Sequence, residues 1–485
     1  MDGTTEAADV RAGHFWLADN DEHKVSGRLT LDQGAAPRLE LDQALTPLLR
    51  ELEPREQPEG SRTLVFADAG PESEFFVVHG AVNDGTAVTL VDAFQKKRKV
   101  GAGADRQWLQ AQFAVLGDHL GGRDQLYTEI RLQLRHLDAW AALPGFALED
   151  VTASGQDRVT LAFRGSSPSP VSLRGGGQLD LEQTPEIEFS PLHGGRIGRA
   201  VWVRATGLPP ATIDDLERRF VTPLSSLLTL ATDAACPPVA VEVATGPNQP
   251  WLTLQNSGLE GPAEEARTPD RQLLPLAALG LDRVATWLGS VDVLGPLPPV
   301  VAAAAAGSRG PLETQLLELT TVAEGLHRAL FGNPRRLSGG QAERAREAVR
   351  ASVRDLEENV RGAVEGAIQY LEDPSFPQRL QQLADRVGAA MPGVTGRTNR
   401  WKHCVTDIRN EFAHRDYGFL ESARISELVS VRESLRWLLT GLLLLRTGLS
   451  PEELAARVES HQPYVLFRHQ ARAWLPRVFR EPTDQ

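Results

Sequence analysis

Arginine and histidine side chains at a short spacing are the first residues of this sequence that could do chemistry. A histidine titrates near neutral pH and can donate or accept a proton. An arginine suits the negative charge that builds on phosphoryl oxygens, so such a pair suits the cleavage of a phosphate ester. The spacing occurs at three places: Arg131 with His136, Arg397 with His403, and Arg409 with His414. A chain with 11 His and many Arg residues produces it by chance, so the local pattern must distinguish the three pairs.

Two of these pairs have ordinary structural explanations. The alternating segment Ile130-Arg-Leu-Gln-Leu-Arg-His-Leu137 predicts a strand, on which Arg131 and His136 point to opposite faces. We interpret that pair as structural. Arg397 stands in a Gly-Arg-Thr-Asn turn, which leaves its register to His403 undefined. His403 is therefore either an exposed helix residue or an auxiliary phosphate contact.

The third pair lies in a segment with a helical pattern. Three apolar residues repeat at helical spacing and predict one buried stripe: Val405, Ile408 and Phe412. At about 100° per residue, Arg409, Asn410 and His414 form a polar flank beside that stripe. Ala413 lies within the flank and leaves room for a backbone or a substrate to approach.

The angular positions on this helix also predict how many copies one site needs. Asn410 and His414 are an i, i+4 pair and can hydrogen-bond. Arg409 and His414 do not lie on one line, so a single ideal helix would not direct both at one phosphate. Two copies related by a two-fold axis would do so, and we expect a homodimer or a higher homo-oligomer that contains this dimer. The alternative is a surface helix with an ordinary polar cluster.

The first part of the chain has the pattern of an α+β fold. Short β-rich runs punctuated by Gly, Asp and Pro occur at residues 63–66, 74–78, 87–91, 158–163 and 200–204. Helical patterns interrupt them at residues 212–232 and 271–288. A new set of strands follows Leu143-Pro-Gly145, so residues 1–293 could be subdivided near residue 145.

The second part predicts an all-α bundle. Residues 294–311 are rich in Pro, Ala and Gly and are the expected linker. Helix-period apolar residues then mark the segments 312–331, 340–372, 376–390, 397–417, 422–447 and 451–478. We therefore expect an α+β fold class, in which a β-rich N-terminal region with interspersed helices precedes a helical domain at residues 312–485.

Composition excludes several classes of protein. The net charge of −13 argues against a general polyanion binder, although residues 395–485 hold 14 Lys and Arg against 11 Asp and Glu. Only Cys236 and Cys404 occur, too few for a disulfide framework or a zinc site. Residues 1–10 lack the apolar core of a signal peptide, and the apolar run at 437–445 is too short to cross a membrane. We expect a cytoplasmic protein without a membrane segment.

One motif points to a different activity. Leu337-Ser-Gly-Gly-Gln341 copies the signature loop of ABC-type ATPases. That chemistry also needs a Gly-rich phosphate loop ending in Lys, and none of the lysines in this sequence follows a glycine. Ser338 and Gln341 instead have the spacing of a capping box that opens a helix.

Two further stretches resemble a known family. Asp407-Ile-Arg-Asn-Glu-Phe-Ala-His414 resembles the R-N-x-x-A-H form of HEPN domains, and the helices at residues 321–332 and 437–449 resemble those of the ApeA-like HEPN domain. Gly13-His-Phe-Trp-Leu17, followed by Val25-Ser-Gly-Arg-Leu29, resembles the opening of the ApeA N-terminal domain. Ala18 stands where that family commonly has Pro.

The resemblance implies an RNA-cleaving effector of abortive anti-phage defence. Arg409 and His414 would be its catalytic pair, with Asn410 beside the arginine. Cleavage would need neither a metal nor another cofactor and would leave 2′,3′-cyclic phosphate ends, with tRNA as one candidate substrate. The N-terminal region would be a sensor that responds to a phage-derived trigger. The alternative within the same family is a catalytically silent HEPN module that binds a nucleotide or a partner protein.

Several other side chains are secondary candidates. We expect His403, Arg415 and Asp416 to contact the substrate, although Asp416 could instead cap the end of the helix. Glu324 and His327 lie on the first predicted helix of the bundle and could reach the site, or could lie on a solvated face. The basic run at residues 96–99 is either an exposed loop or a contact for RNA or a phage component.

Overall fold

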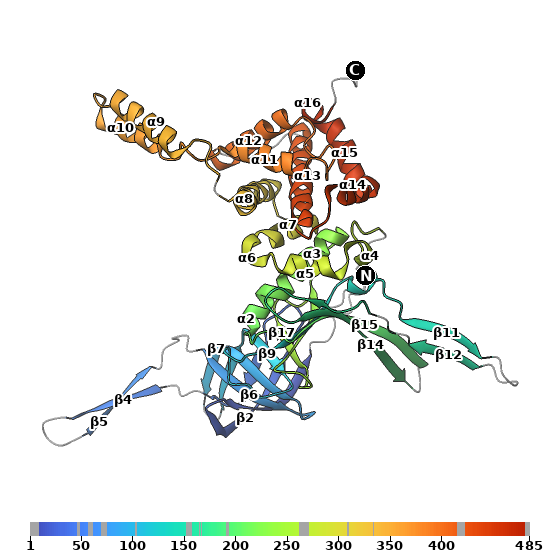
Figure 1. The fold of residues 1–485 in the computed structure, drawn as a ribbon. Helices are drawn as coiled ribbons and strands as arrows, with labels where there is room; N and C mark the ends of the chain where they lie inside the picture. The colour runs from blue at the N-terminus through green and yellow to red at the C-terminus, as the bar shows by residue number, and fades with distance from the viewer. Residues whose placement is uncertain are drawn as a thin grey trace. The chain divides into compact units, whose positions relative to one another are not determined.

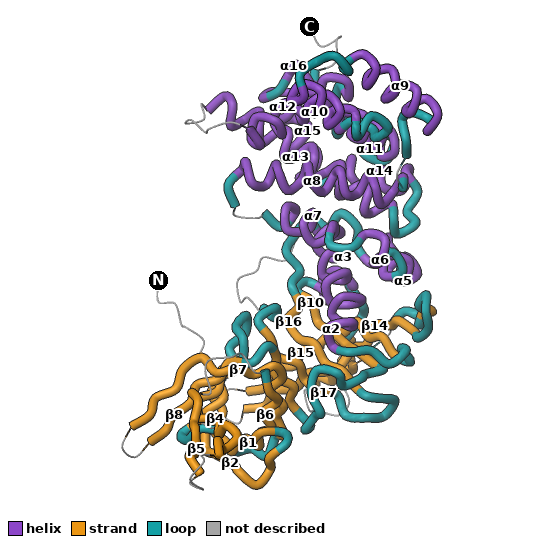
Figure 2. Tube along the Cα trace, turned by 90° about the vertical axis from the view of Figure 1, so that its left-hand side faces the viewer, coloured by secondary structure: helices purple, strands orange, loops and turns teal. Residues whose placement is uncertain are grey.

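The computed structural model describes most of the chain and divides it into two compact units. The described residues are 9–45, 49–56, 62–68, 75–101, 104–151, 158–163, 165, 167–190, 194–260, 271–307, 310–332, 334–414 and 422–480. The first unit comprises residues 1–225 and 236–268, and the second comprises residues 226–235 and 269–485. Strands dominate the first unit, and the described elements of the second are all helices (Figure 1, Figure 2).

A barrel forms one end of the large sheet in the first unit. Its six strands are β1 (Val10–Leu17), β2 (Asn20–Thr30), β3 (Arg38–Leu41), β6 (Phe76–Val82), β7 (Ala87–Gly101) and β8 (Ala104–Gln110). They run in the order β7-β6-β1-β2-β3-β8, and β8 pairs back to β7, which closes the barrel. Fully buried side chains such as Phe15, Leu29 and Leu90 fill its interior.

Close strand approach explains two glycines in the N-terminal stretches that resemble the ApeA family. A Cβ atom at Gly13 would collide with the carbonyl oxygen of Ala81 on β6. A Cβ atom at Gly27 would lie 2.7 Å from the carbonyl oxygen of Glu40 on β3. The pairing of β1 with β6 and of β2 with β3 therefore requires glycine, which has no side chain, at both positions.

The sheet continues from the barrel through seven more strands. Beyond β7 the order is β9 (Phe113–Leu116), β17 (Leu252–Asn256), β16 (Pro238–Ala244), β10 (Glu129–Leu134), β15 (Gly194–Thr206), β14 (Gln178–Ser190) and β13 (Val171–Ser172). Two separate hairpins are formed by β4 (Leu49–Glu56) with β5 (Arg62–Asp68) and by β11 (Phe146–Val151) with β12 (Arg158–Phe163). The helical elements are α1 (Leu137–Ala141), α2 (Ile213–Leu216), the π-helix η1 (Glu217–Val221) and the start of α3 (Thr222–Thr232).

The structure confirms the structural interpretation of Arg131. Its guanidinium on β10 lies 2.6 Å from a carboxylate oxygen of Glu242 and stacks over the rings of Trp202 and Trp251. His136 follows the end of the strand, at a backbone φ of 65°. Arg131 therefore stabilises the sheet, while His136 lies beyond the end of the strand.

The second unit is a bundle around helix α13 (Ser422–Leu445), which packs against α7, α8, α11, α14 and α15. The other helices are α4 (Leu276–Leu279), α5 (Leu281–Leu288), α6 (Val291–Leu294), α7 (Leu297–Ala305), α8 (Leu312–Phe331), α9 (Gly339–Ser352), α10 (Glu358–Ile368), α11 (Phe376–Val387), α12 (Thr398–His414), α14 (Pro451–Ser460), α15 (Gln462–Trp474) and α16 (Pro476–Phe479). The apolar run that begins at Trp437 is buried within α13. Across the described residues, no helix is both long and apolar enough to span a membrane.

The structure corrects the expected linker at residues 294–311. Residues 297–305 form α7, whose Val301 is fully buried and which packs against α8 and α13. Pro298 and Pro299 lie in the first turn of α7, where a missing N–H costs no helical hydrogen bond. The segment therefore belongs to the bundle, and the division between the two units falls between residues 268 and 269.

The structure divides two of the predicted helical segments into shorter helices. Residues 340–372 form α9 and α10, and residues 451–478 form α14, α15 and α16. Pro463 and Pro476 stand in the first turns of α15 and α16, where they cannot continue the preceding helix. The predicted capping box of Ser338 and Gln341 is confirmed at the start of α9.

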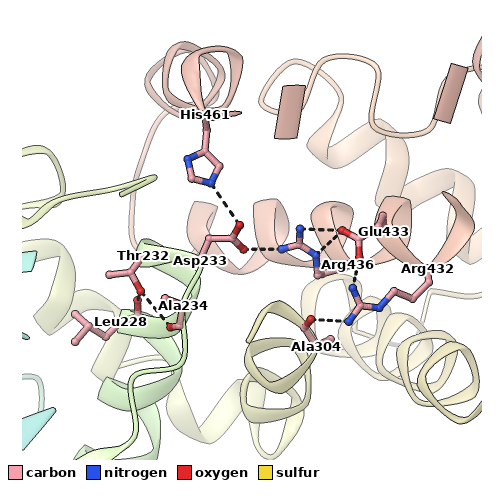
Figure 3. Close-up of polar contacts among 9 residues, drawn as sticks. All are labelled: Leu228, Thr232, Asp233, Ala234, Ala304, Arg432, Glu433, Arg436 and His461. Carbon is pink, nitrogen blue, oxygen red and sulfur yellow. Dashed lines mark hydrogen bonds and ion pairs between the residues drawn. The ribbon is translucent and has the colours of Figure 1, made fainter. Parts of the chain in front are cut away.

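Residues 226–235 tie the end of α3 into the helical bundle (Figure 3). Asp233 lies 2.7 Å from the guanidinium of Arg436 on α13 and 3.5 Å from the ring of His461. Glu433 also accepts from Arg436, at 2.9 Å, and contacts Arg432, whose guanidinium donates to the carbonyl oxygen of Ala304. A segment from the middle of the chain thus becomes part of the core of the second unit.

Candidate functional site

Helix α12 carries the Arg409–His414 motif, and its apolar stripe is buried as predicted. Trp401, Val405, Ile408 and Phe412 are all at most 5% exposed. The helix packs against α8, α11 and α16. Because one side of α12 is fixed in the core, Arg409 remains on its flank and Asn410 on its outer surface.

Arg409 lies on the flank of α12 that faces α8 and α11. One Nη atom of its guanidinium is 3.1 Å from a carboxylate oxygen of Glu324 on α8. The guanidinium also lies over the ring of Phe376, 4.3 Å from the ring centroid. The ion pair and the cation–π contact together hold the arginine in one orientation. Glu324 additionally accepts from Arg328, at 2.9 Å.

Asn410 and His403 lie on the outer surface of α12. Both are exposed, as is Asp407, and the three positions follow one another at helical spacing along one line. His414 is the last residue of α12, and its backbone is one turn beyond Asn410. The structure therefore brings Arg409 to Glu324 and Phe376, and it leaves Asn410 on a different side of the helix.

Two expected substrate contacts cannot be located. Arg415 and Asp416, together with Tyr417, lie outside the described residues. Of the three expected substrate-binding residues, only His403 has a position in the structure, and it is exposed on α12 two turns before Asn410.

His327 is a core residue of the bundle. It is fully buried on α8, stacks on Phe331 and lies 2.5 Å from the amide oxygen of Gln382. Its Nδ1 faces the guanidinium of Arg379 at 3.0 Å. An arginine can only donate, so Nδ1 accepts and Nε2 donates to Gln382, which is the pattern of a neutral imidazole. Burial lowers the pKa of His327, and the nearby Arg379 lowers it further.

The expectation of a solvated face at Glu324 and His327 is therefore wrong. Glu324 is half-buried and binds Arg409, while His327 packs within the bundle. Sequence reasoning identified both residues but could not separate their roles, because the contacts connect helices that are far apart in sequence. It missed Phe376 altogether, since nothing in the sequence links it to Arg409.

A salt bridge also fixes the last turns of α12. Glu411 lies 2.5 Å from the guanidinium of Arg424 on α13, and Arg424 pairs with Glu427 as well, at 3.0 Å. The helix end that carries Asn410 is thus anchored to the central helix of the bundle. Nothing in the sequence pattern singled out Arg424.

The described residues contain no group of three or more His, Cys, Asp or Glu side chains arranged to hold a metal ion. Among the described residues of α12, the polar side chains include the guanidinium of Arg409, the amide of Asn410, the carboxylate of Asp407 and the imidazole of His403. Such groups can bind a phosphate and transfer protons.

Comparison with protein families accounts for most of the chain. The family described as ApeA N-terminal domain 1 matches residues 10–283, and the family described as Apea-like HEPN matches residues 317–453. The second match runs from within α8 to the start of α14 and contains the Arg409–His414 motif. No curated protein and no solved structure matches the chain. The N-terminal match alone spans more than half of the sequence, so the chain belongs to the ApeA-like HEPN proteins, a family of anti-phage effectors.

Proposed function

We propose that this protein is a metal-independent endoribonuclease that causes abortive infection, with Arg409, Asn410 and His414 as its catalytic residues. The observation that carries the proposal is the position of the motif on one continuous helix of an ApeA-like HEPN domain. The helix buries its apolar stripe and leaves Asn410 exposed, while Arg409 is held at its flank. HEPN domains are generally ribonucleases.

The proposed reaction uses a nucleophile that RNA itself supplies. The 2′-oxygen attacks the adjacent phosphorus, the 2′-proton is removed, and the bond to the 5′-oxygen breaks as that oxygen takes up a proton. His414 performs a proton transfer, and Asn410 orients it or a phosphate oxygen. Arg409 stabilises the charge on the phosphoryl oxygens. The products are a 2′,3′-cyclic phosphate and a 5′-hydroxyl.

The Glu324 contact is compatible with this role for Arg409. A guanidinium has five N–H donors, and Glu324 is bonded to one of its Nη atoms. The remaining donors can bind a phosphate while the carboxylate keeps the side chain in position. Arg409 is also half-exposed, with 31% of its side chain accessible.

We further propose that two copies build each site. Arg409 and His414 are about 140° apart around the helix axis, which prevents one copy from directing both at the same phosphate. In a two-fold dimer, Arg409 of one protomer and His414 of the other meet at a shared cleft. The exposed line through Asp407 and Asn410 supplies a surface for that contact.

We also propose a regulatory role for the first unit. The β-rich first unit is a separately packed body that matches the ApeA N-terminal domain. We propose that it senses a phage-derived trigger and that the nuclease then acts in the cytoplasm, with tRNA as the substrate.

Cleavage of labelled tRNA by the purified full-length protein, with and without phage lysate, tests the function. We expect His414→Ala to abolish cleavage without changing the fold, and EDTA to have no effect. Undiminished cleavage by the variant would refute the assignment, and complete inhibition by EDTA would indicate a metal nuclease. A silent HEPN scaffold, the competing function, would bind a nucleotide or a partner protein, and neither the wild type nor the variant would cleave RNA.

A further inference from the structure

A basic pocket lies between α11, α12 and the segment that follows α8, and its one residue on α12, Lys402, is two turns before Arg409. Its volume is about 230 Å³. The lining residues are Pro334, Arg335, Arg336, Pro374, Gln378, Gln381, Gln382 and Lys402. Three of these side chains are cationic, three are amides and none is a carboxylate, so the lining suits an anion that also accepts hydrogen bonds.

Two of the three cations keep their charge available. Lys402 donates to the side-chain oxygen of Gln381 at 3.0 Å, and Arg336 donates to the carbonyl oxygen of Leu371 at 2.7 Å. Both acceptors are neutral, and among the described residues neither cation has a carboxylate within ion-pair distance. An incoming anion would therefore meet positive charge that the protein has not already neutralised.

The third cation, Arg335, has a carboxylate partner. Arg335 pairs with Glu372 at 2.5 Å, and the same carboxylate also receives Arg346 at 2.8 Å. Glu372 therefore divides its charge between Arg335 and Arg346, and Arg346 also lies 3.6 Å from Glu343. With the other two cations of the lining unpaired by carboxylates among the described residues, the pocket lining keeps a net positive charge. Glu372 itself does not line the pocket.

The pocket is on the same side of α12 as Arg409. Lys402 and Arg409 are seven residues apart, which corresponds to about 10.5 Å along the helix and only about 20° around it. Helix α11 runs beside both, since Phe376 contacts Arg409 and Gln381 contacts Lys402. A linear polyanion lying along this side of α12 could therefore touch the pocket and Arg409 at once.

We propose that the pocket formed by Arg335, Arg336 and Lys402 binds a backbone phosphate of the RNA strand, next to the phosphate held at Arg409. This inference rests on the proposed ribonuclease function and gives the site a direction along α12. The side-chain oxygens of Gln378, Gln381 and Gln382 already accept from Ser375, Lys402 and His327, so their remaining amide N–H groups would contact the adjoining sugar or base.

RNA binding by the full-length His414→Ala variant tests the pocket without interference from cleavage. The probe is a short fluorescent oligouridine, titrated over a range of salt concentrations. Adding Lys402→Gln should weaken binding about tenfold, as expected for a lost hydrogen bond between charged groups. It should also reduce the slope of log affinity against log salt by about 0.7 for the lost phosphate contact. Adding Arg336→Gln should reduce the slope again, and Lys402→Arg should restore most of the affinity.

Arg472→Gln is the matched control. Arg472 is exposed on α15 and lines a different basic pocket, with Arg468 and Arg480. The control should bind RNA as the parent does. If Arg472→Gln lowers the affinity and Lys402→Gln does not, the RNA follows α15 and the proposal is overturned. Failure of the parent to bind RNA at all would also overturn it.

Cleavage kinetics separate this inference from the proposed function. In the otherwise wild-type protein, Lys402→Gln should raise KM and leave kcat nearly unchanged. Cleavage with an unchanged KM would refute the pocket but not the ribonuclease. RNA binding that depends on Lys402, without any cleavage by the wild type, would refute the ribonuclease but not the pocket.

Discussion

The guanidinium of Arg409 lies 3.1 Å from the carboxylate of Glu324, a residue 85 positions earlier in the chain. The contact joins α12 to α8 and, together with the ring of Phe376, fixes the arginine at the flank of the motif helix. Glu324 is thus a positioning residue in the proposed mechanism, and its effect on catalysis is measurable.

Two substitutions of Glu324 distinguish the effect of its hydrogen-bond acceptor on Arg409 from the effect of its negative charge. In Glu324→Ala, Arg409 loses its anchor, and we expect kcat to fall about tenfold, which corresponds to about 1.4 kcal/mol of transition-state stabilisation. Glu324→Gln keeps an oxygen acceptor and should retain most of the activity. Steady-state kinetics on labelled RNA measure both. An Ala variant more active than the wild type would mean that Glu324 inhibits the enzyme.

Mixing two inactive variants tests whether a site takes residues from two copies. Arg409→Ala and His414→Ala should each be inactive alone. When they are mixed and allowed to exchange subunits, half of the dimers are mixed, and one of the two sites in each mixed dimer is intact. Activity should therefore return to about a quarter of the wild-type level. No recovery, with subunit exchange shown by mass measurement, would place both residues of a site on one copy.

Breaking the Asp233–Arg436 ion pair should destabilise the bundle. The side chains of Arg436 and Asp233 are 6% and 12% exposed, so removing one partner leaves a buried charge. We expect Asp233→Asn to lower the free energy of unfolding by about 3 kcal/mol. Denaturant unfolding measures the loss, and Asp292→Asn, at an exposed position on α6, is the control. Equal stability of the two variants would show that Glu433 alone suffices for Arg436.

The stability of the bundle should fall on mild acidification. Burial lowers the pKa of His327 in the folded state below its ordinary value of 6.5. The unfolded chain therefore binds a proton at His327 more readily than the folded protein does. The stability that neutral His327 contributes is fully present above the unfolded pKa, and it is lost as the pH falls from there towards the folded pKa. Thermal unfolding between about pH 7 and about pH 5 should show this loss. His327→Gln should be less stable at neutral pH but less sensitive to acid, and an unchanged pH dependence would contradict the assignment.

The sequence predicted local structure well where one pattern determined it. The predicted helix at residues 312–331 has the bounds of α8, and the stripe of Val405, Ile408 and Phe412 is buried. The strands near residues 63–66, 87–91 and 200–204 are all present. In each case the spacing of apolar residues, or the enrichment in β-branched and aromatic residues, reflects the burial of one face.

Long-range pairings were beyond the reach of these patterns. Local sequence patterns do not indicate which distant segments contact each other. Three such contacts are the closure of the barrel by β7 and β8, the ion pair of Asp233 with α13, and the Glu324–Arg409 contact. The linker prediction was wrong at residues 297–305 because a Pro- and Ala-rich composition is typical of linkers. Pro at the start of a helix and Ala within it are also favourable for a helix. Their burial in the bundle decided the outcome.

The chemistry of the RNA ends is a direct test of cleavage by His414. Total RNA is taken from cells that express the wild type or His414→Ala, with and without phage infection, and the ends of discrete fragments are determined. We expect fragments with 2′,3′-cyclic phosphate and 5′-hydroxyl ends in infected wild-type cells and none in the variant. Identical fragments in both strains, or wild-type fragments with 5′-phosphate ends, would contradict that expectation.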